Sequence, residues 1–288
     1  MERHTIAGMT KGAYVILAAL LLLTRGAAAE PIRIGVSDFI YGDLAHQIGD
    51  PAIAVTLLKP EKATANEVTA FAQIEVVVCS GTKADALFCD TAKQISPPPI
   101  VIEGLHYATT RRQDLKVLWY DFKAMLGLTQ KLAAELSRRM PAEAPHIAAN
   151  LTRTQQAFQA IDLKIEEIAK VYRNADVIIT DGLFRGLVER LRLKVQDDDY
   201  VSSQQRGVAP SAKSIATLKN ALQRREASIL LYDQDASTPA IRDLAASARD
   251  KGTPVVGLRE TLPRGLHYQQ WMLRQLNAIY GALDESAP

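Results

Sequence analysis

HIAANLTRTQQAFQAIDLKIEEIAKVYR (residues 146–173) is the stretch of sequence that decides the fold. The side chains that mark one face recur every three or four residues, which is the spacing of an α-helix. These side chains are Ile147, Leu151, Thr154, Phe158, Ile161, Ile165, Ile168 and Tyr172. At 1.5 Å per residue such a helix extends about 40 Å, which is long for a globular domain. It is therefore either a coiled-coil segment or a rigid connection between two lobes.

Strand-like and helix-like segments alternate on both sides of this helix. IEVVVCSG (74–81) is a near-continuous apolar run, which is typical of a strand buried on both faces in a parallel sheet. Alternation with helical patterns indicates βαβ units. Strands are expected at 32–36, 52–58, 74–81, 100–105, 176–180, 227–233 and 253–258, and helices at 38–49, 83–95, 121–140, 181–193, 211–226, 238–252 and 267–283.

The fold class predicted by this order is α/β, with two lobes joined by one long backbone helix. Each lobe is a mostly parallel sheet flanked by helices. The expected boundaries are 30–140 for the N-terminal lobe, 141–172 for the linking helix and 173–288 for the C-terminal lobe. Between the helix at 181–193 and the helix that Ser211 caps, the sequence predicts a polar loop.

Residues 1–29 have the pattern of a signal peptide. Arg3 and Lys11 are followed by the apolar run AYVILAALLLLT (13–24) and by the small residues that end at Ala29. The run is shorter than the roughly 20 residues of a spanning helix, so cleavage near Ala29 and export to the periplasm are expected. The alternative is an uncleaved N-terminal anchor.

The charge of the remaining chain argues against two classes of partner, nucleic acids and membrane surfaces. Removal of residues 1–29 takes away three basic residues and one acidic residue, which leaves a chain with no formal net charge. Such a chain lacks the basic footprint of a nucleic-acid-binding protein and the polybasic tether of a membrane-surface protein.

Cys79 and Cys89 are the two cysteines of the chain. In an exported protein they can form a disulfide that closes a short loop. They can also be two inert buried thiols. A pair of soft metal ligands is the third reading, and the lack of a nearby histidine argues against it.

Four segments resemble the solute-binding proteins of bacterial zinc and manganese ABC importers, whose two lobes share one long helix. GVAPSAKSIATLKNALQRREASILLYDQ (207–234) resembles the family segment in which PSA is followed by a helix, a strand and a carboxylate before Pro-Gln. KVLWYDFKAMLGLTQKLAAEL (116–136), VIITDGLFRGLVERLRL (177–193) and LHYQQWMLRQLNAIYGAL (266–283) resemble three further family segments. The resemblance extends over nearly the whole chain after residue 29.

The resemblance implies a metal site between the lobes, made by three histidines and one carboxylate. Carried over one position at a time, the histidines fall on Asn66, Val117 and Thr180, and the carboxylate falls on Asp233. Asn66 and Asp233 are therefore the candidate metal ligands. This set suits zinc poorly, because zinc is bound by imidazole nitrogen and carboxylate oxygen, whereas an amide oxygen is a poor ligand, a hydroxyl is weaker still and valine offers none. The alternative is a hard oxygen shell for manganese. That shell would contain Asn66, Glu67, Thr180, Asp181, Asp233 and Asp235.

The other histidines are not expected to replace the missing ligands. His46, His146 and His267 lie in or next to predicted helices, and His106 lies in a loop. The cleft is instead expected to hold a small polar solute, or a hydrated or chelated metal, by hydrogen bonds. Asp233 has a second reading, the cap of the next helix. The candidate ligand-binding residues are Asn66, Val117, Tyr120, Thr180, Asp181, Asp233 and Asp235.

The function implied by the resemblance is that of a periplasmic substrate-binding component of an ABC importer, with a permease and its ATPase as partners. A monomer is expected, and no cofactor is certain. The alternative is an interaction or regulatory protein that reuses this scaffold. An enzyme is not expected, because the sequence has no nucleophile elbow and no phosphate-binding glycine loop.

Overall fold

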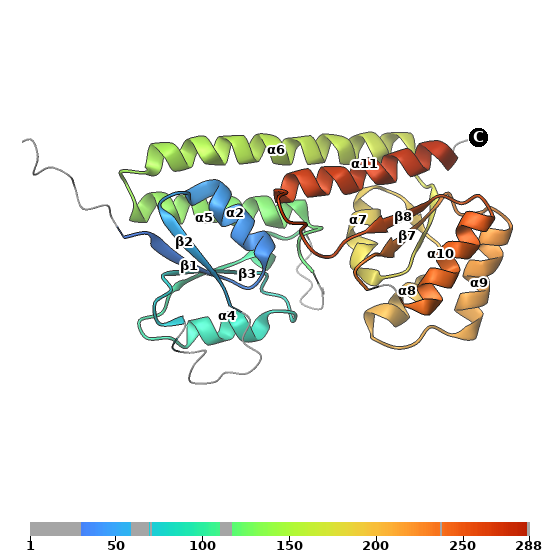
Figure 1. Ribbon diagram of the computed structural model, residues 1–288, viewed down its shortest axis with the longest axis horizontal. Coiled ribbons are helices and arrows are strands. Elements are labelled where there is room, and N and C mark those ends of the chain that lie inside the picture. Colours follow the sequence, from blue (N-terminus) through green and yellow to red (C-terminus); the bar gives the residue numbers. More distant parts are fainter. Residues whose placement is uncertain (1–29, 59–68, 70, 110–116, 237, 287–288) are drawn as a thin grey trace, which may run out of the picture.

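The computed structural model describes residues 30–58, 69, 71–109, 117–236 and 238–286. Two groups of strands and helices lie below a long helix, as Figure 1 shows. The signal segment 1–29 and the candidate ligand Asn66 lie outside the described residues. No helix of the described part is both long enough and apolar enough to cross a membrane.

The N-terminal lobe contains a sheet of four parallel strands in the order β2-β1-β3-β4. Its buried strand β3 has four fully covered side chains, which is why its sequence is apolar without alternation. The elements are β1 (Ile32–Val36), α2 (Phe39–Gly49), β2 (Ile53–Leu57), β3 (Val76–Cys79), α4 (Ala86–Lys93), β4 (Ile100–Glu103), η1 (Gly104–Tyr107) and α5 (Phe122–Arg139).

The C-terminal lobe repeats this plan with the order β6-β5-β7-β8, again all parallel. Its elements are β5 (Asp176–Ile179), η2 (Gly182–Phe184), α7 (Arg185–Arg190), β6 (Lys194–Val195), α8 (Asp198–Gln205), α9 (Ala212–Gln223), β7 (Ile229–Asp233), α10 (Pro239–Asp250), β8 (Val255–Leu258) and α11 (Tyr268–Ser286). The predicted fold class, two α/β lobes and a long helix, is confirmed.

The polar loop predicted after residue 193 is wrong, because this segment contains β6 and α8. Strand β6 has only two residues and pairs with β5. Helix α8 is polar along most of its length, and Tyr200 and Val201 are its buried apolar side chains. The neighbouring prediction is confirmed: Ser211 caps α9, and its hydroxyl accepts from Ser214 N at 3.1 Å.

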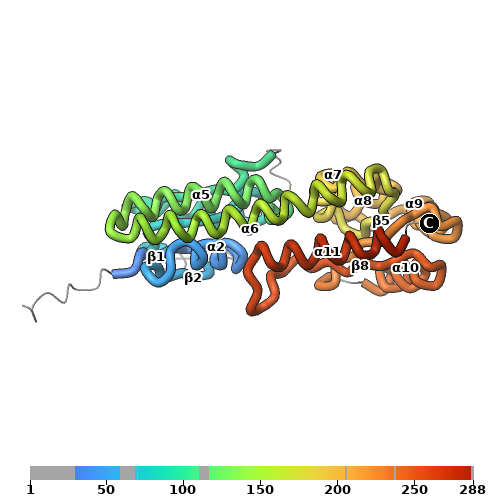
Figure 2. Tube along the Cα trace, turned by 90° about the horizontal axis from the view of Figure 1, so that it is seen from above, coloured from blue at the N-terminus to red at the C-terminus, as the bar shows by residue number. Residues whose placement is uncertain are grey.

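The long helix α6 (Ala144–Val171) has 28 residues and packs against both lobes. It contacts α5 and α2 of the N-terminal lobe and α11 of the C-terminal lobe, so it is a connection within one molecule and not a free coiled-coil segment. Figure 2 shows α6 and α11 side by side along the molecule. One hydrophobic core runs through both lobes beneath α6, with Phe158 and Ile161 among its members.

The two lobes are also joined directly by hydrogen bonds. Tyr268 N and His267 Nδ1, at the start of α11, both contact the Asp43 carboxylate of α2, at 2.8 and 2.7 Å. The Tyr268 hydroxyl donates to Trp119 O at 2.6 Å. These contacts hold the beginning of α11 against the N-terminal lobe.

Candidate functional site

Thr180 and Asp233 lie at the carboxyl ends of two neighbouring strands of the C-terminal lobe. Asp233 is the last residue of β7, and Thr180 directly follows β5, which pairs with β7. Both residues are 1% exposed. Thr180 Oγ1 and Asp233 Oδ2 are buried atoms without a hydrogen-bond partner among the described residues. Buried polar atoms are nearly always paired, so an unpaired hydroxyl and an unpaired carboxylate oxygen indicate a place where a ligand supplies the partner.

The Asp233 carboxyl is in an unfavourable place for a negative charge. Burial raises its pKa, and the nearby carboxylates of Glu260, Asp235 and Asp181 raise it further. Its Oδ1 accepts from Asp235 N at 2.8 Å. It does not cap the next helix, since the cap of α10 is Thr238, whose hydroxyl accepts from Ile241 N.

The Asp235 carboxylate is already paired with other groups of the protein. Its Oδ1 pairs with the Arg259 guanidinium at 2.9 Å, and its Oδ2 accepts from Glu260 N, Thr261 N and the Thr261 hydroxyl. The residue therefore fixes the loop that follows β8. The same loop carries Glu260, which lines a cavity at the N-terminal lobe.

Asp181 and Tyr120 are also engaged by the chain. Asp181 caps the short helix η2 by accepting from Leu183 N at 2.9 Å. The Tyr120 hydroxyl donates to Arg259 O across the lobes at 2.8 Å, and its ring meets Phe184 edge-on at 5.8 Å. Burial raises the pKa of Tyr120 far above its usual value, so this phenol stays protonated. Tyr120 is a contact between lobes rather than a group with free hydrogen-bonding capacity.

The carboxyl ends of the N-terminal strands border a cavity of about 310 Å³. Ser37 and Asp38 follow β1, Ser80 follows β3, and Val117 precedes α5; all four line the cavity. Glu260 lines it from the C-terminal lobe. Ligands of open α/β sheets bind at this end of the strands. The cavity lies at the expected place for a ligand between the lobes.

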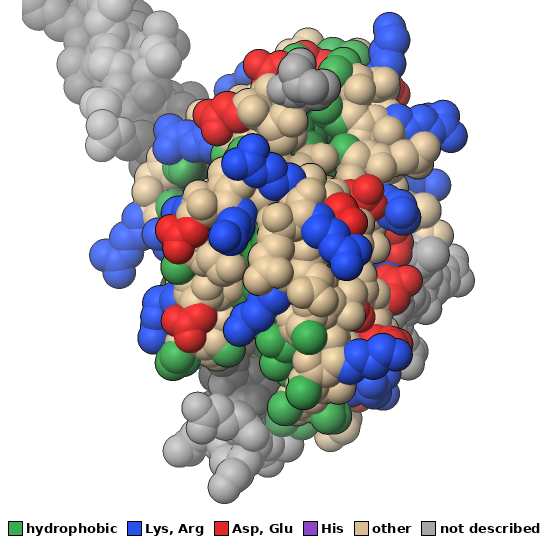
Figure 3. Space-filling model, turned by 90° about the vertical axis from the view of Figure 1, so that its right-hand side faces the viewer, with side chains coloured by type: hydrophobic (Ala, Val, Ile, Leu, Met, Phe, Trp, Pro, Cys, Tyr) green, Lys and Arg blue, Asp and Glu red, His purple; other side chains and the backbone are tan. Residues whose placement is uncertain are grey.

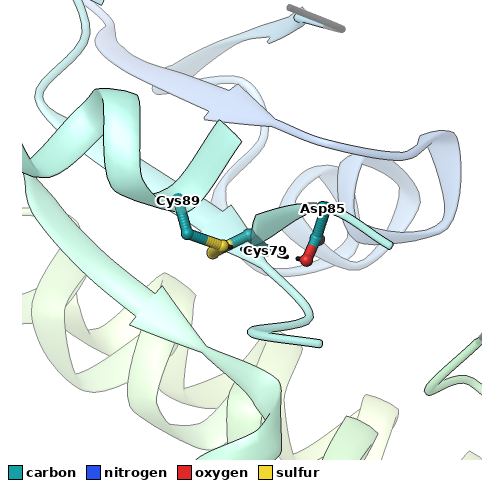
Figure 4. A group of neighbouring side chains, drawn as sticks. All are labelled: Cys79, Asp85 and Cys89. Carbon is teal, nitrogen blue, oxygen red and sulfur yellow. Dashed lines mark hydrogen bonds between the residues drawn. A yellow bond between two sulfur atoms is a disulfide. The ribbon is translucent and has the colours of Figure 1, made fainter. Parts of the chain in front are cut away.

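The wall of the cavity on the β3–α4 side is held by Asp85. Its carboxylate accepts from the Ser37 hydroxyl at 2.7 Å, from Ser80 N at 2.6 Å and from the Ser80 hydroxyl at 2.5 Å. Beside it, Cys79 and Cys89 form the disulfide drawn in Figure 4. Their Cα atoms are 6.3 Å apart. These bonds tie the ends of β1 and β3 to the start of α4. The loop wall is thus fixed independently of any ligand.

Among the described residues, the one cluster of three or more side chains able to hold a metal is Cys79, Asp85 and Cys89. Both sulfurs of that cluster are joined in the disulfide, so they are not available as thiolates.

The described histidines have other contacts. His46 and His146 contact Asp50, and His267 contacts Asp43, all around α2. His106 lies 3.9 Å from Glu103.

Several residues that line the cavity were missed by the sequence analysis, notably Ser37, Asp38, Ser80 and Glu260. Ser37 and Asp38 come just after the predicted strand 32–36, and Ser80 lies at the end of the predicted strand 74–81, so the strand-end rule for α/β sheets could have found them. No local signal marks Glu260. Of the predicted residues, Val117 lines this cavity, and Thr180 and Asp233 lie together at the ends of β5 and β7.

A family model and several solved structures match this chain. A family model described as "Zinc-uptake complex component A periplasmic" matches residues 34–282. No curated protein sequence matches the chain.

Three solved structures illustrate the structural similarity, and at identities below 25% they show the fold alone. The SBP FpvC from Pseudomonas aeruginosa in complex with Mn²⁺ has a TM-score of 0.69 and 18% identity, over 90% of this chain and 100% of that one. The periplasmic zinc-binding protein TroA from Treponema pallidum has a TM-score of 0.67 and 12% identity, over 88% of this chain and 99% of that one. The laminin-binding protein Lbp of Streptococcus pyogenes has a TM-score of 0.70 and 16% identity, over 88% of this chain and 100% of that one.

Proposed function

Because the chain belongs to the family of periplasmic zinc-uptake components, we propose that it is the substrate-binding component of an ABC importer whose ligand contacts Thr180 and Asp233. The observation that carries this proposal is the pair of buried oxygens at the ends of the neighbouring strands β5 and β7, which have no hydrogen-bond partner among the described residues. A ligand that donates hydrogen bonds or carries positive charge would satisfy both atoms.

The donor set between the lobes does not suit a bare zinc ion. Of the four positions implied by the family, Asn66 has only an amide side chain and Val117 offers only carbon. Thr180 offers a neutral hydroxyl, and Asp233 offers one carboxylate oxygen that has no partner among the described residues. Zinc sites in proteins use imidazole, thiolate and carboxylate ligands in a closed tetrahedron. The cargo of this protein is therefore proposed to be something other than bare zinc, held by hydrogen bonds and charge.

Capture is proposed to involve only a small change in the lobe arrangement. Helix α6 packs against both lobes, and the Tyr120–Arg259 and Tyr268–Trp119 hydrogen bonds join them on the ligand side of the helix. A large hinge motion would break these buried contacts. After capture, the loaded protein would dock on its permease, which the ATPase drives. Residues 1–29 are proposed to direct export to the periplasm.

The test is to identify what the protein carries when it is purified without chelator. Native mass spectrometry and elemental analysis are expected to show no stoichiometric zinc. A small solute from a periplasmic extract is expected to raise the melting temperature of the protein. Asp233→Asn should abolish this shift, while Asp243→Asn, an exposed carboxylate on α10 of the same lobe, should leave it unchanged.

Two outcomes would contradict the proposal. Stoichiometric zinc would show that the remaining donors are sufficient for the bare ion. A solute whose binding is unaffected by Asp233→Asn would show that the ends of β5 and β7 are not the site. The genes beside this one separate transport from the alternative interaction role, because transport predicts a permease and an ATPase among them.

A further inference from the structure

The Asp235 carboxylate binds several donors of one loop, residues 259–261, which directly follows β8. Its Oδ1 pairs with the Arg259 guanidinium at 2.9 Å. Its Oδ2 accepts from Glu260 N and Thr261 N, each at 3.2 Å, and from the Thr261 hydroxyl at 2.8 Å. Hydrogen bonds to a carboxylate are among the stronger ones in proteins. The position of the 259–261 loop therefore follows the position of Asp235.

Asp235 is in turn bonded to Asp233, the proposed ligand contact at the end of β7. Asp235 N donates to Asp233 Oδ1 at 2.8 Å. Gln234, between them, is bonded to β8, because its N donates to Leu258 O at 2.8 Å and its Nε2 donates to Gly257 O at 2.6 Å. The turn after β7 is thus fixed to β8, and the Asp233 carboxyl is one of the groups that support it.

The 259–261 loop contacts the N-terminal lobe through Tyr120. The Tyr120 hydroxyl donates to Arg259 O at 2.8 Å, and Arg259 N donates to Gln275 Oε1 of α11 at 2.9 Å. Tyr120 is 4% exposed and Gln275 is 7% exposed, so water does not readily replace a lost partner here. The backbone of Arg259 is thus bonded to the N-terminal lobe, while its guanidinium is bonded to Asp235.

Tyr120 lies in a segment of the N-terminal lobe, residues 119–122, that meets the C-terminal lobe at several points. The Tyr120 ring meets Phe184 of η2 edge-on at 5.8 Å. The Arg190 guanidinium of α7 lies over the Phe122 ring, 5.5 Å from its centroid. Helix η2 follows β5 as the 259–261 loop follows β8, so the ends of both strands contact this one segment of the other lobe.

We propose that Asp235 is a positioning residue that couples the ligand contact at Asp233 to Tyr120, and through Tyr120 to the arrangement of the two lobes. A ligand that engages the Asp233 carboxyl changes the hydrogen bond from Asp235 N, and the 259–261 loop moves with Asp235. That movement changes the contact between Tyr120 and Arg259. The inference rests on the proposed function, which places the ligand at Asp233, and it adds the route by which binding reaches the N-terminal lobe.

Coupling is measured by a double-mutant cycle, because a chain of contacts does not establish it by itself. Asp235→Asn keeps the shape of the side chain but replaces one accepting oxygen by an amino group that donates. Tyr120→Phe removes the hydroxyl and keeps the ring against Phe184. The readout is amide hydrogen exchange of residues 119–122, followed by mass spectrometry on the full chain without ligand.

Asp235→Asn is expected to speed exchange at residues 119–122 about tenfold, because the loop loses hydrogen bonds to a charged group. The double variant with Tyr120→Phe is expected to exchange no faster than the faster single variant, since both changes break one link. Asp233→Ala removes the acceptor of Asp235 N and is expected to speed exchange there only where Asp235 is intact. If Asp235→Asn does not fold, Thr261→Val, which removes one donor at similar volume, is expected to act in the same direction.

Two controls match these changes. Asp243→Asn makes the same replacement at an exposed position on α10 of the same lobe. Tyr172→Phe removes a hydroxyl that is bonded to Asp284 Oδ1, at the C-terminal end of α6. Both are expected to leave exchange at residues 119–122 unchanged.

Two results would overturn the inference. The first is faster exchange at residues 259–261 of the Asp235→Asn or Thr261→Val variant with no change at residues 119–122, which would mean that Asp235 fixes its own loop and nothing further. The second is additive effects of Asp235→Asn and Tyr120→Phe. Neither result affects the proposed function, because the thermal shift that depends on Asp233 is measured separately. Loss of that dependence would contradict the proposed function and leave the exchange results standing.

Discussion

Asp233 is a buried carboxyl: one oxygen accepts a hydrogen bond from Asp235 N, and the other has no partner in the part of the chain that the structure describes. Burial and then the charges of Glu260, Asp235 and Asp181 raise its pKa in the folded protein. Between the unfolded value, near 4, and this higher value, the folded state binds more protons than the unfolded state. Folding stability from this group is therefore fully present below about pH 4 and falls as the pH rises through the folded pKa.

Replacement of Asp233 by its neutral isostere asparagine should remove the loss of stability that ionisation of the carboxyl causes. In the absence of ligand, Asp233→Asn is expected to melt at a higher temperature than the unchanged protein at pH 7. The difference should shrink as the pH is lowered towards 4, where the Asp233 carboxyl is itself protonated. Thermal unfolding followed by circular dichroism at several pH values measures it, with Asp243→Asn as the control. A lower melting temperature for Asp233→Asn at pH 7 would mean that the ionised carboxylate has a stabilising partner.

At the scale of elements, the disulfide fixes the connection between β3 and α4. Cys79 ends β3 and Cys89 lies in α4, with a sequence separation of 10. Between them the chain turns at Gly81, whose φ of 76° lies in the left-handed region that suits glycine. The residues of this turn form one wall of the cavity, so the covalent bond stabilises the local geometry of the candidate site.

Removal of the disulfide should cost a measurable share of the stability. For a loop of this length, the chain-entropy model gives about 2.7 kcal/mol at 25 °C. The Cys79→Ser, Cys89→Ser double variant is expected to lose about this much in free energy of unfolding, measured by urea denaturation. The unchanged protein under reducing conditions serves as the comparison and should show a similar loss. A loss below about 0.5 kcal/mol in both would show that the loop is held by the Asp85 hydrogen bonds instead.

Strand β6 and helix α8, which follow residue 193, were not predicted from the sequence. Helix α8 offers Tyr200 and Val201 as its buried apolar side chains, and β6 is two residues long. Asp197 caps α8 from a left-handed conformation with φ of 57°. Such short elements have no periodic apolar pattern, so they form only because β5 and the helices around them supply the packing.

At the scale of the whole molecule, α6 sets the relation of the lobes. Its buried face, which includes Phe158, Ile161 and Ile165, belongs to the one core that extends through both lobes. Charged groups of both signs are interspersed on the end of the C-terminal lobe, as Figure 3 shows. That face offers no single-sign patch of the kind that binds nucleic acid.

A break in α6 should uncouple the two lobes. Leu163 is 60% exposed, so its replacement removes little packing. Leu163→Pro is expected to cost about 3 kcal/mol through the lost backbone bond and the clash of the ring, and to weaken ligand binding. Leu163→Ala should change stability by less than about 0.5 kcal/mol. Calorimetry is expected to show a broadened or split unfolding transition for the proline variant. A single transition at the original temperature would mean that the direct contacts between the lobes couple their unfolding without an intact α6.

The sequence by itself determined the two α/β lobes, the long helix and the positions of Thr180 and Asp233 at strand ends. These follow from apolar periodicity and strand order, which are local properties of the chain. Tertiary structure alone decided that Glu260 faces the N-terminal cavity, that Asp235 fixes the loop after β8, and that Tyr120 meets Arg259. Each of these depends on how segments distant in sequence pack together, and a packing arrangement of that kind leaves no period or spacing in the sequence.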